Sequence, residues 1–208
     1  MPHVVLSDND ALIKIAALDL IDAALKALGV SSAKEVFVLP TFKRMVQKNH
    51  AYIATRAGRD GFNRLVKFVQ VARAIDKKPD PDDEFAMEGV ESIDSGEVML
   101  FAACRNYPES LVLTGDKRAI RAVSEHAACG PIRKLLAGKV VCVEQLVRRI
   151  LDGGGFDAVR DAVQANQWCD GRLTRIFNHG CTRAACISGL EVAIGELRLC
   201  TPAILVAN

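Results

Sequence analysis

The sequence predicts an α/β protein with a three-layer α/β/α arrangement, in which helices cover both faces of a mostly parallel sheet. Short apolar runs alternate with helical patterns from residue 4 to residue 151, as expected for parallel strands buried on both faces. Two of these runs end in a small polar residue, with an aspartate soon after it. A chain of 208 residues, of which 50% are hydrophobic, is long enough to bury such a core.

Acidic residues follow the first predicted strand at its carboxyl end. Residues 4–6 form an apolar triplet, and Ser7 is followed by Asp8, Asn9 and Asp10. Open α/β sheets place their chemistry at the carboxyl ends of strands. Apolar residues at helical spacing over residues 11–28 predict a helix that stops at Gly29. The N-terminus of that helix would lie beside the carboxylates, where its dipole favours negative charge.

The second predicted strand, residues 36–39, is followed by a basic segment. Helical patterns cover residues 41–57 and 60–75, and a proline-containing loop covers residues 77–83. The charge then inverts, because residues 80–97 contain acids but no lysine or arginine. Solvated helix faces explain such charges taken singly, yet a basic arm beside an acidic site would also hold a phosphodiester backbone near bound cations. The candidate backbone contacts are Lys43, Arg44, Lys48, Arg64 and Lys67.

Two acids begin the helix predicted over residues 93–105. Asp94 and Ser95 are good N-caps, and Glu97 falls in the first turn, where a glutamate completes a capping box. Capping accounts for both acids. It still allows the side chain of Glu97 to point into a cleft from that first turn.

Residues 111–116, LVLTGD, repeat the pattern of the first strand and lead into a helix over residues 117–126. A further strand and helix follow over residues 139–143 and 144–151. Short connections in a parallel sheet bring the strand ends after Leu6 and Leu113 to one edge, so Asp8 and Asp116 are expected to meet.

The glycines at 153–155 form a natural hinge between an expected domain, residues 1–151, and a helical C-terminal extension, residues 152–208. Helical stretches over residues 156–168, 173–178 and 184–200 are expected to pack on the main domain or on a second copy of it. Seven cysteines without regular spacing favour reduced thiols, and a structural zinc site in the extension is the less favoured interpretation.

Composition excludes several classes of protein. A formal net charge of +2 does not by itself require a polyanionic partner. The first apolar run stops at Ser7, which argues against a signal peptide, and no apolar run approaches the roughly 18 residues of a membrane span. We therefore expect a soluble, cytoplasmic protein without membrane contact.

The predicted acids would form a cluster at one edge of the sheet. Asp8, Glu97 and Asp116 stand at its centre, with Asp10 and Asp94 as neighbours. Like charges a few Å apart raise one another's pKa values, and a divalent cation resolves this repulsion. Carboxylates are the ligands that Mg²⁺ or Mn²⁺ prefers, and such ions polarise a phosphodiester and lower the pKa of a bound water.

The order of motifs resembles that of PIN-like domain nucleases, which include the ribonuclease toxins of bacterial toxin and antitoxin pairs. DNDALI ends the first strand, SGEVMLFAAC opens a central helix, and LVLTGDKRAIRAV follows, together covering roughly residues 2–151. The resemblance implies a PIN-like fold. It also places the metal-binding acids of the family on Asp8, Glu97 and Asp116.

Two positions depart from the family pattern. Asp10 stands where the family usually has Asn or Ser, and Lys43 and Arg44 stand near a position where it tends to carry another acid. A full metal site would then need Asp10 or Asp94 as a substitute ligand. The alternative is a catalytically impaired PIN-like module that binds RNA or a protein partner without cutting.

A haloacid-dehalogenase-type phosphatase is a further alternative, with Asp8 as nucleophile and Asp10 as acid and base. It fits less well, because no further acid follows Gly115-Asp116 within the next few residues.

We therefore expect a metal-dependent ribonuclease, a hydrolase that holds Mg²⁺ or Mn²⁺ with Asp8, Glu97 and Asp116, assisted by Asp10 or Asp94. The basic helices and Lys117 would contact the RNA backbone. A homodimer is expected because one small domain offers only a short groove. The resemblance also implies an inhibitory, antitoxin-like protein partner.

Overall fold

A computed structural model describes residues 4–207 of the chain, and these residues form a five-stranded sheet in which every pairing is parallel. The predicted α/β class is therefore confirmed. The strands lie in the order β3-β2-β1-β4-β5. Their bounds are β1 Val4–Ser7, β2 Val36–Val38, β3 Arg73–Ala74, β4 Ser110–Thr114 and β5 Val140–Cys142.

The order of the strands creates a switch point between β1 and β4. From β1 the chain builds outward to β2 and β3, and then returns across the sheet to β4 on the other side of β1. Ser7 pairs with Leu113, so the residues that follow these two strands emerge side by side. Ligand sites of open α/β sheets form at such a switch point, outside the carboxyl ends of the strands.

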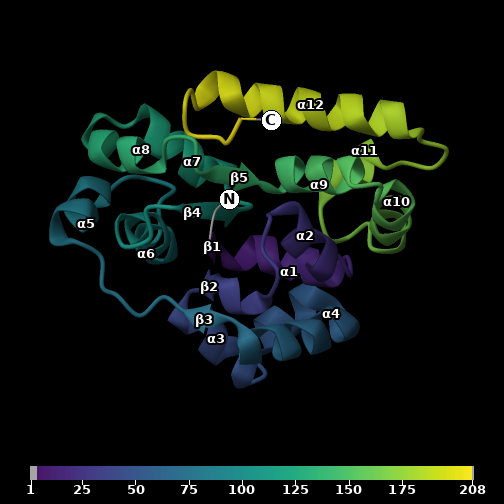
Figure 1. Cartoon of the computed structure of the whole chain (residues 1–208), viewed down its shortest axis with the longest axis horizontal. Coiled ribbons are helices and arrows are strands. Elements are labelled where there is room, and N and C mark those ends of the chain that lie inside the picture. The colour runs from purple at the N-terminus through teal and green to yellow at the C-terminus, as the bar shows by residue number, and fades with distance from the viewer. Residues whose placement is uncertain (1–3, 208) are drawn as a thin grey trace.

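Helices cover both faces of the sheet, which confirms the three-layer arrangement. Figure 1 shows α5, α6 and α8 on one side of the strands and α1, α2, α4 and α9 on the other. The helices up to the last strand are α1 Asn9–Ala17, α2 Ile21–Ala27, α3 Pro40–Gln47, α4 Ala51–Val71, α5 Pro81–Met87, α6 Ser95–Ala102, α7 Lys117–Glu125 and α8 Gly130–Leu136. Single turns of 3₁₀ helix lie at Ala33–Glu35, Ala103–Arg105 and Ala127–Cys129.

The helix predicted over residues 11–28 is two helices, α1 and α2. The chain turns between them at Asp19, which has a positive φ of 57°. The apolar spacing continues through this turn, which is why the sequence pattern does not show it. The helix predicted over residues 41–57 is likewise divided, because α3 ends at Gln47 and Asn49 has φ 55° before α4 begins.

Three elements were not predicted as the structure has them. Strand β3 is only two residues long and follows directly on α4, so no apolar run marks it. Helix α8 is short and was also not predicted. The prediction of a loop over residues 77–83 is wrong at its end, because Asp80 caps α5 with its side chain and Pro81 begins that helix.

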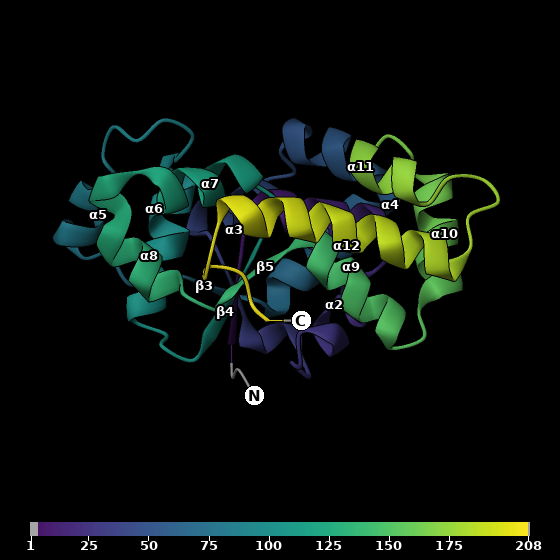
Figure 2. The same cartoon turned by 90° about the horizontal axis from the view of Figure 1, so that it is seen from above.

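The C-terminal extension packs on the rest of the same chain. It comprises α10 Phe156–Ala165, α11 Gly171–Ile176 and α12 Arg183–Cys200, which follow α9 Val143–Asp152. Helix α12 lies along the β5 side of the molecule and contacts both α9 and α7 (Figure 1, Figure 2). Beyond α12 the chain runs beside β5, where Val140 donates to the carbonyl of Ile204 at 3.2 Å and accepts from the N–H of Val206 at 2.9 Å.

The apolar side chains form one continuous core that includes residues of the extension. All seven cysteines are free thiols. No helix within residues 4–207 combines the length and the apolar character needed to cross a membrane.

Candidate active site

A cavity of about 600 Å³ opens at the carboxyl ends of β1 and β4, at the switch point of the sheet. Its walls come from the turns after these two strands, from the start of α6, and from α3 and α4. The five acids proposed from the sequence all line it, namely Asp8, Asp10, Asp94, Glu97 and Asp116. We call this the acidic cavity.

Asp8 is the first residue after β1, and the strand pairing holds it in place. Its backbone N–H donates to the carbonyl of Leu113 on β4 at 2.9 Å. Its side chain is buried and makes no capping bond to α1, and one carboxylate oxygen accepts from the N–H of Gly115 at 3.4 Å. Burial raises the pKa of Asp8, and the nearby charge of Asp10 raises it further.

Gly115 explains how the acids come so close to the turn after β4. A Cβ atom at this position would lie 2.9 Å from a carboxylate oxygen of Asp10. Any other residue would displace that carboxylate. The glycine therefore lets Asp10 lie directly against the backbone of the turn that carries Asp116.

Asp94 and Glu97 form the capping box at the start of α6. The Asp94 side chain accepts from the N–H groups of Gly96 and Glu97 at 2.7 and 2.9 Å, and Glu97 accepts from the N–H of Asp94 at 2.9 Å. Glu97 is nevertheless in the wall of the cavity. Burial, together with the carboxylates of Asp94 and Asp8, raises the pKa of Glu97 to about 8, so this side chain is largely protonated at pH 7.

Asp116 is held by the first turn of α7. Its carboxylate accepts from the N–H groups of Arg118 and Ala119 at 2.8 and 3.1 Å, and its own N–H donates to the Thr114 hydroxyl at 3.0 Å. The Arg118 guanidinium lies 3.3 Å from the other carboxylate oxygen. The helix N-terminus thus orients this carboxylate at the cavity without burying it.

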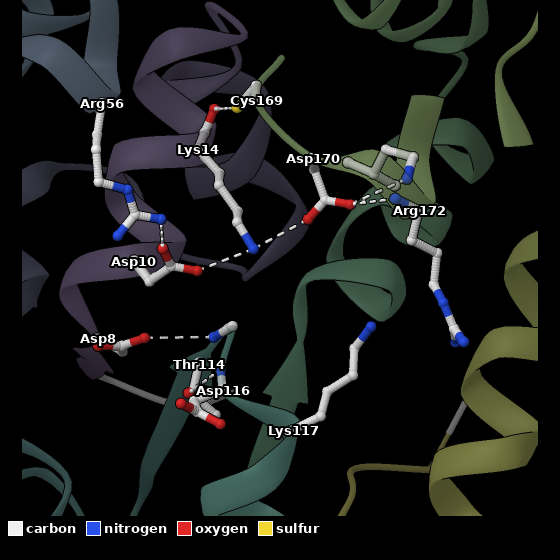
Figure 3. Close-up of polar contacts among 12 residues, drawn as sticks. Asp8, Asp10, Lys14, Arg56, Thr114, Asp116, Lys117, Cys169, Asp170 and Arg172 are labelled. Atoms are coloured by element: carbon white, nitrogen blue, oxygen red, sulfur yellow. Dashed lines mark hydrogen bonds and ion pairs between the residues drawn. The ribbon is translucent and has the colours of Figure 1, made fainter. Parts of the chain in front are cut away.

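Asp10 differs from the other acids because two cations neutralise it. It forms ion pairs with Arg56 from α4 and with Lys14, whose ammonium is 2.9 Å from the carboxylate (Figure 3). Lys14 lies equally close, at 2.9 Å, to Asp170 of the C-terminal extension. Although burial lowers the pKa of Lys14, the two carboxylates raise it above its usual value, so the lysine stays charged. Figure 3 shows these four side chains as one continuous chain of ion pairs.

The extension therefore reaches the site through Asp170. This residue caps α11 by accepting from the N–H groups of Arg172 and Leu173 at 2.9 and 3.0 Å. Burial opposes its charge, but the ammonium of Lys14 holds the pKa of Asp170 below its usual value. A fully charged carboxylate from residue 170 thus supports a side chain from the first helix.

The basic residues proposed as backbone contacts are scattered. Lys43 donates to the carbonyl of Ala72 at 2.6 Å, Arg64 donates to the carbonyl of Ala16 at 3.0 Å, and Lys117 pairs with the buried Glu144. Of the predicted cations only Lys117 lines the acidic cavity. The others, including Arg44, Lys48 and Lys67 on the exposed surface, lie outside its walls.

Some side chains at the site were missed by the sequence analysis. Arg56, Arg118 and Tyr52 line the cavity, and Lys14 and Asp170 support it from behind. Lys14 could have been found, because it stands four residues after Asp10 on a predicted helix, a spacing that favours an ion pair. Asp170 could not, because nothing in its local sequence indicates a partner in the first helix.

The donors at the cavity suit a hard divalent cation. Asp8 and Asp116 offer carboxylate oxygens, and a cation would draw the proton from Glu97. Within residues 4–207, however, no three acidic, histidine or cysteine side chains already converge as a ready-made metal centre. Asp10, Asp94 and Glu97 are each occupied by a cation or by the capping box. Binding of a metal therefore requires side-chain adjustment.

Comparisons of this chain with protein-family models, with curated proteins and with solved structures give no match. The resemblance to PIN-like nucleases therefore stays a prediction. The geometry of the acidic cavity carries the functional proposal.

Proposed function

We propose that this protein is a metal-dependent ribonuclease that hydrolyses phosphodiester bonds at the acidic cavity. One observation carries the proposal. Five acids from three separate segments of the chain line a single cavity at the switch point of a parallel sheet. Asp8, Glu97 and Asp116 would hold Mg²⁺ or Mn²⁺, with Asp94 or Asp10 assisting.

Some residues of the acidic cavity would bind the cation, and others would bind the substrate. A bound divalent cation supplies polarisation of the phosphodiester and a lowered pKa of water. Asp116 is already oriented by backbone N–H groups, and its second carboxylate oxygen would have to leave the Arg118 guanidinium to bind the cation. Arg118, which is exposed on the first turn of α7, can bind a phosphate oxygen, whereas Lys117 would first have to leave its ion pair with Glu144. Glu97 would give up its proton when the cation binds.

A second candidate function is supported by the pairing of Asp10. Because Arg56 and Lys14 neutralise it, Asp10 is a poor replacement for a missing metal ligand. This favours the catalytically impaired module that binds RNA or protein without cutting. The same ion pairs weigh against the phosphatase alternative, because they occupy the carboxylate of Asp10 that would have to act as acid and base.

Cleavage of a mixed single-stranded and structured RNA tests the proposal, with Mn²⁺, Mg²⁺ or EDTA present. Asp116→Asn is the informative variant, because asparagine caps a helix as well as aspartate does but is a much weaker ligand. We expect metal-dependent cleavage that falls more than about 100-fold in the variant, since even outer-shell changes at metal sites cost 10- to 100-fold.

Asp22→Asn is the matched control, because Asp22 is an exposed acid in the first turn of α2. It should cleave like the unaltered protein. RNA binding without cleavage under every metal condition would overturn the nuclease proposal in favour of the binding module.

A further inference from the structure

A second cavity, of about 500 Å³, lies on the other side of Arg56 along α4. Its walls come from the turn between α1 and α2, from the middle of α4, and from α10 with the segment that follows it. Trp168 stands in its wall. We call this the tryptophan cavity.

Trp168 is the only tryptophan of the chain, and 56% of it is exposed. The indole lies beside Gly58 of α4, which has a φ of 68° and interrupts the helical geometry. A Cβ atom at Gly58 would lie 3.4 Å from the indole ring. The aromatic ring is thus seated against the helix backbone while much of its surface stays in contact with water.

Contacts of the two residues after Trp168 fix its position relative to the acidic cavity. The next residue, Cys169, lies with its sulfur 3.7 Å from the carbonyl of Lys14. Asp170 then pairs with the Lys14 ammonium, which in turn holds Asp10. On α4, Gly58 stands only two residues after Arg56, the other partner of Asp10. The segment that carries Trp168 is therefore anchored to the side chains that hold Asp10 in the acidic cavity.

Aromatic and cationic side chains follow one another along this part of α4. Tyr52 is 52% exposed, and Arg56 both donates to its hydroxyl at 2.7 Å and lies 5.5 Å from its ring centroid. Arg59 is an exposed cation in the wall of the tryptophan cavity. Asp19 and Asp60 are the acids there, and Asp19 is paired with Arg64 at 2.6 Å.

We propose that Trp168 is a stacking platform for a base of single-stranded RNA that leaves the acidic cavity along α4, with Arg59 contacting its backbone. Single-strand binding sites combine cations that follow the backbone with aromatic faces on which bases stack. Two of the three exposed aromatic side chains within residues 4–207, Tyr52 and Trp168, stand along this path, whereas Phe85 is on α5 in the other helix layer. The inference rests on the proposed function for the identity of the ligand.

The fluorescence of the single tryptophan tests the proposal directly. An unlabelled oligoribonucleotide of about ten residues is titrated into the intact protein in EDTA, so that binding is measured without cleavage. We expect saturable quenching of Trp168 emission. N-acetyltryptophanamide titrated in parallel corrects for light absorption by the RNA.

Four variants separate stacking from other causes, with binding measured by the anisotropy of a labelled copy of the same oligonucleotide. Trp168→Ala should weaken binding about tenfold, as expected for the loss of one base-aromatic stack. Trp168→Phe should retain most of the affinity, and Phe85→Ala should retain all of it. Arg59→Gln should reduce the salt dependence of binding by about one phosphate contact. Circular dichroism confirms that each variant is folded.

The outcomes distinguish this proposal from the proposed function. Absence of RNA binding, or binding that neither quenches Trp168 nor weakens in Trp168→Ala, overturns the stacking platform. Quenching and weakened binding without any metal-dependent cleavage would support the platform while overturning the nuclease.

Discussion

The acidic side chains in the two halves of the acidic cavity have opposite electrostatic surroundings. On one side Asp8 and Glu97 are buried, no cation within residues 4–207 forms an ion pair with either of them, and both pKa values are raised. On the other side Asp10 is balanced by Arg56 and Lys14. The comparison shows that the number of carboxylates at a site does not give the number available to a metal. The number available depends on how many of the carboxylates are paired with cations.

Replacing one acid in each half should give the largest difference in the rate of RNA cleavage. Asp8→Asn is expected to lower metal-dependent RNA cleavage more than about 100-fold, because it removes a metal ligand. Asp10→Asn is expected to lower it by about tenfold or less, because the carboxylate of Asp10 is already neutralised. Initial cleavage rates of the two variants at saturating Mn²⁺ measure this. Equal losses would place Asp10 among the metal ligands and remove the distinction between the halves.

Removing the lysine shared by Asp10 and Asp170 should have the next largest effect. Lys14→Met leaves two partly buried carboxylates without their common cation and should reduce the free energy of unfolding by about 3 kcal/mol. Lys26→Met, at an exposed lysine near the end of α2, is the control and should change it by less than about 0.5 kcal/mol. Urea denaturation curves give both values. A result for Lys14→Met as small as the control would mean that the ion pairs do not support the site.

The cation-free half should make stability depend on pH. The pKa of Glu97 is about 8 in the folded protein and about 4.5 in the unfolded chain, so the folded state binds a proton more tightly. The stabilisation is complete below pH 4.5 and is lost as the pH rises through 8. The raised pKa of Asp8 acts in the same direction. The charged groups that line the cavity together with Glu97 are Asp8, Asp10, Asp94, Asp116, Arg56, Lys117 and Arg118, of which Asp94 and Asp8 raise its pKa.

In EDTA, the free energy of unfolding should therefore fall between pH 5 and pH 8.5, by at most about 4 kcal/mol. Glu97→Gln keeps a side chain that can complete the capping box, so it should remove most of this slope without unfolding α6. Urea curves at a series of pH values test this. A slope that Glu97→Gln leaves unchanged would contradict the assignment of the proton to Glu97.

The sequence predicted the elements that carry strong local signals. The apolar triplets before Asp8 and Asp116 and the capping pair at Asp94 and Glu97 predicted the strands, the central helix and the acids of the cavity. The turn at Asp19 and the two-residue β3 leave no mark on apolar spacing, so they were missed. The pairing of Lys14 with Asp170 depends on how the extension folds back, which no local pattern encodes.

The structure of the two edge strands limits how copies of this chain can associate. Strand β3 offers only two residues to a neighbouring strand, and the other edge, at β5, is occupied by residues 204–206 and flanked by α12. Proteins that shorten or cover their edge strands in this way prevent sheets from pairing edge to edge into larger aggregates. A homodimer of this chain would therefore not form by pairing of edge strands, and its formation would leave the hydrogen bonding of the sheet unchanged.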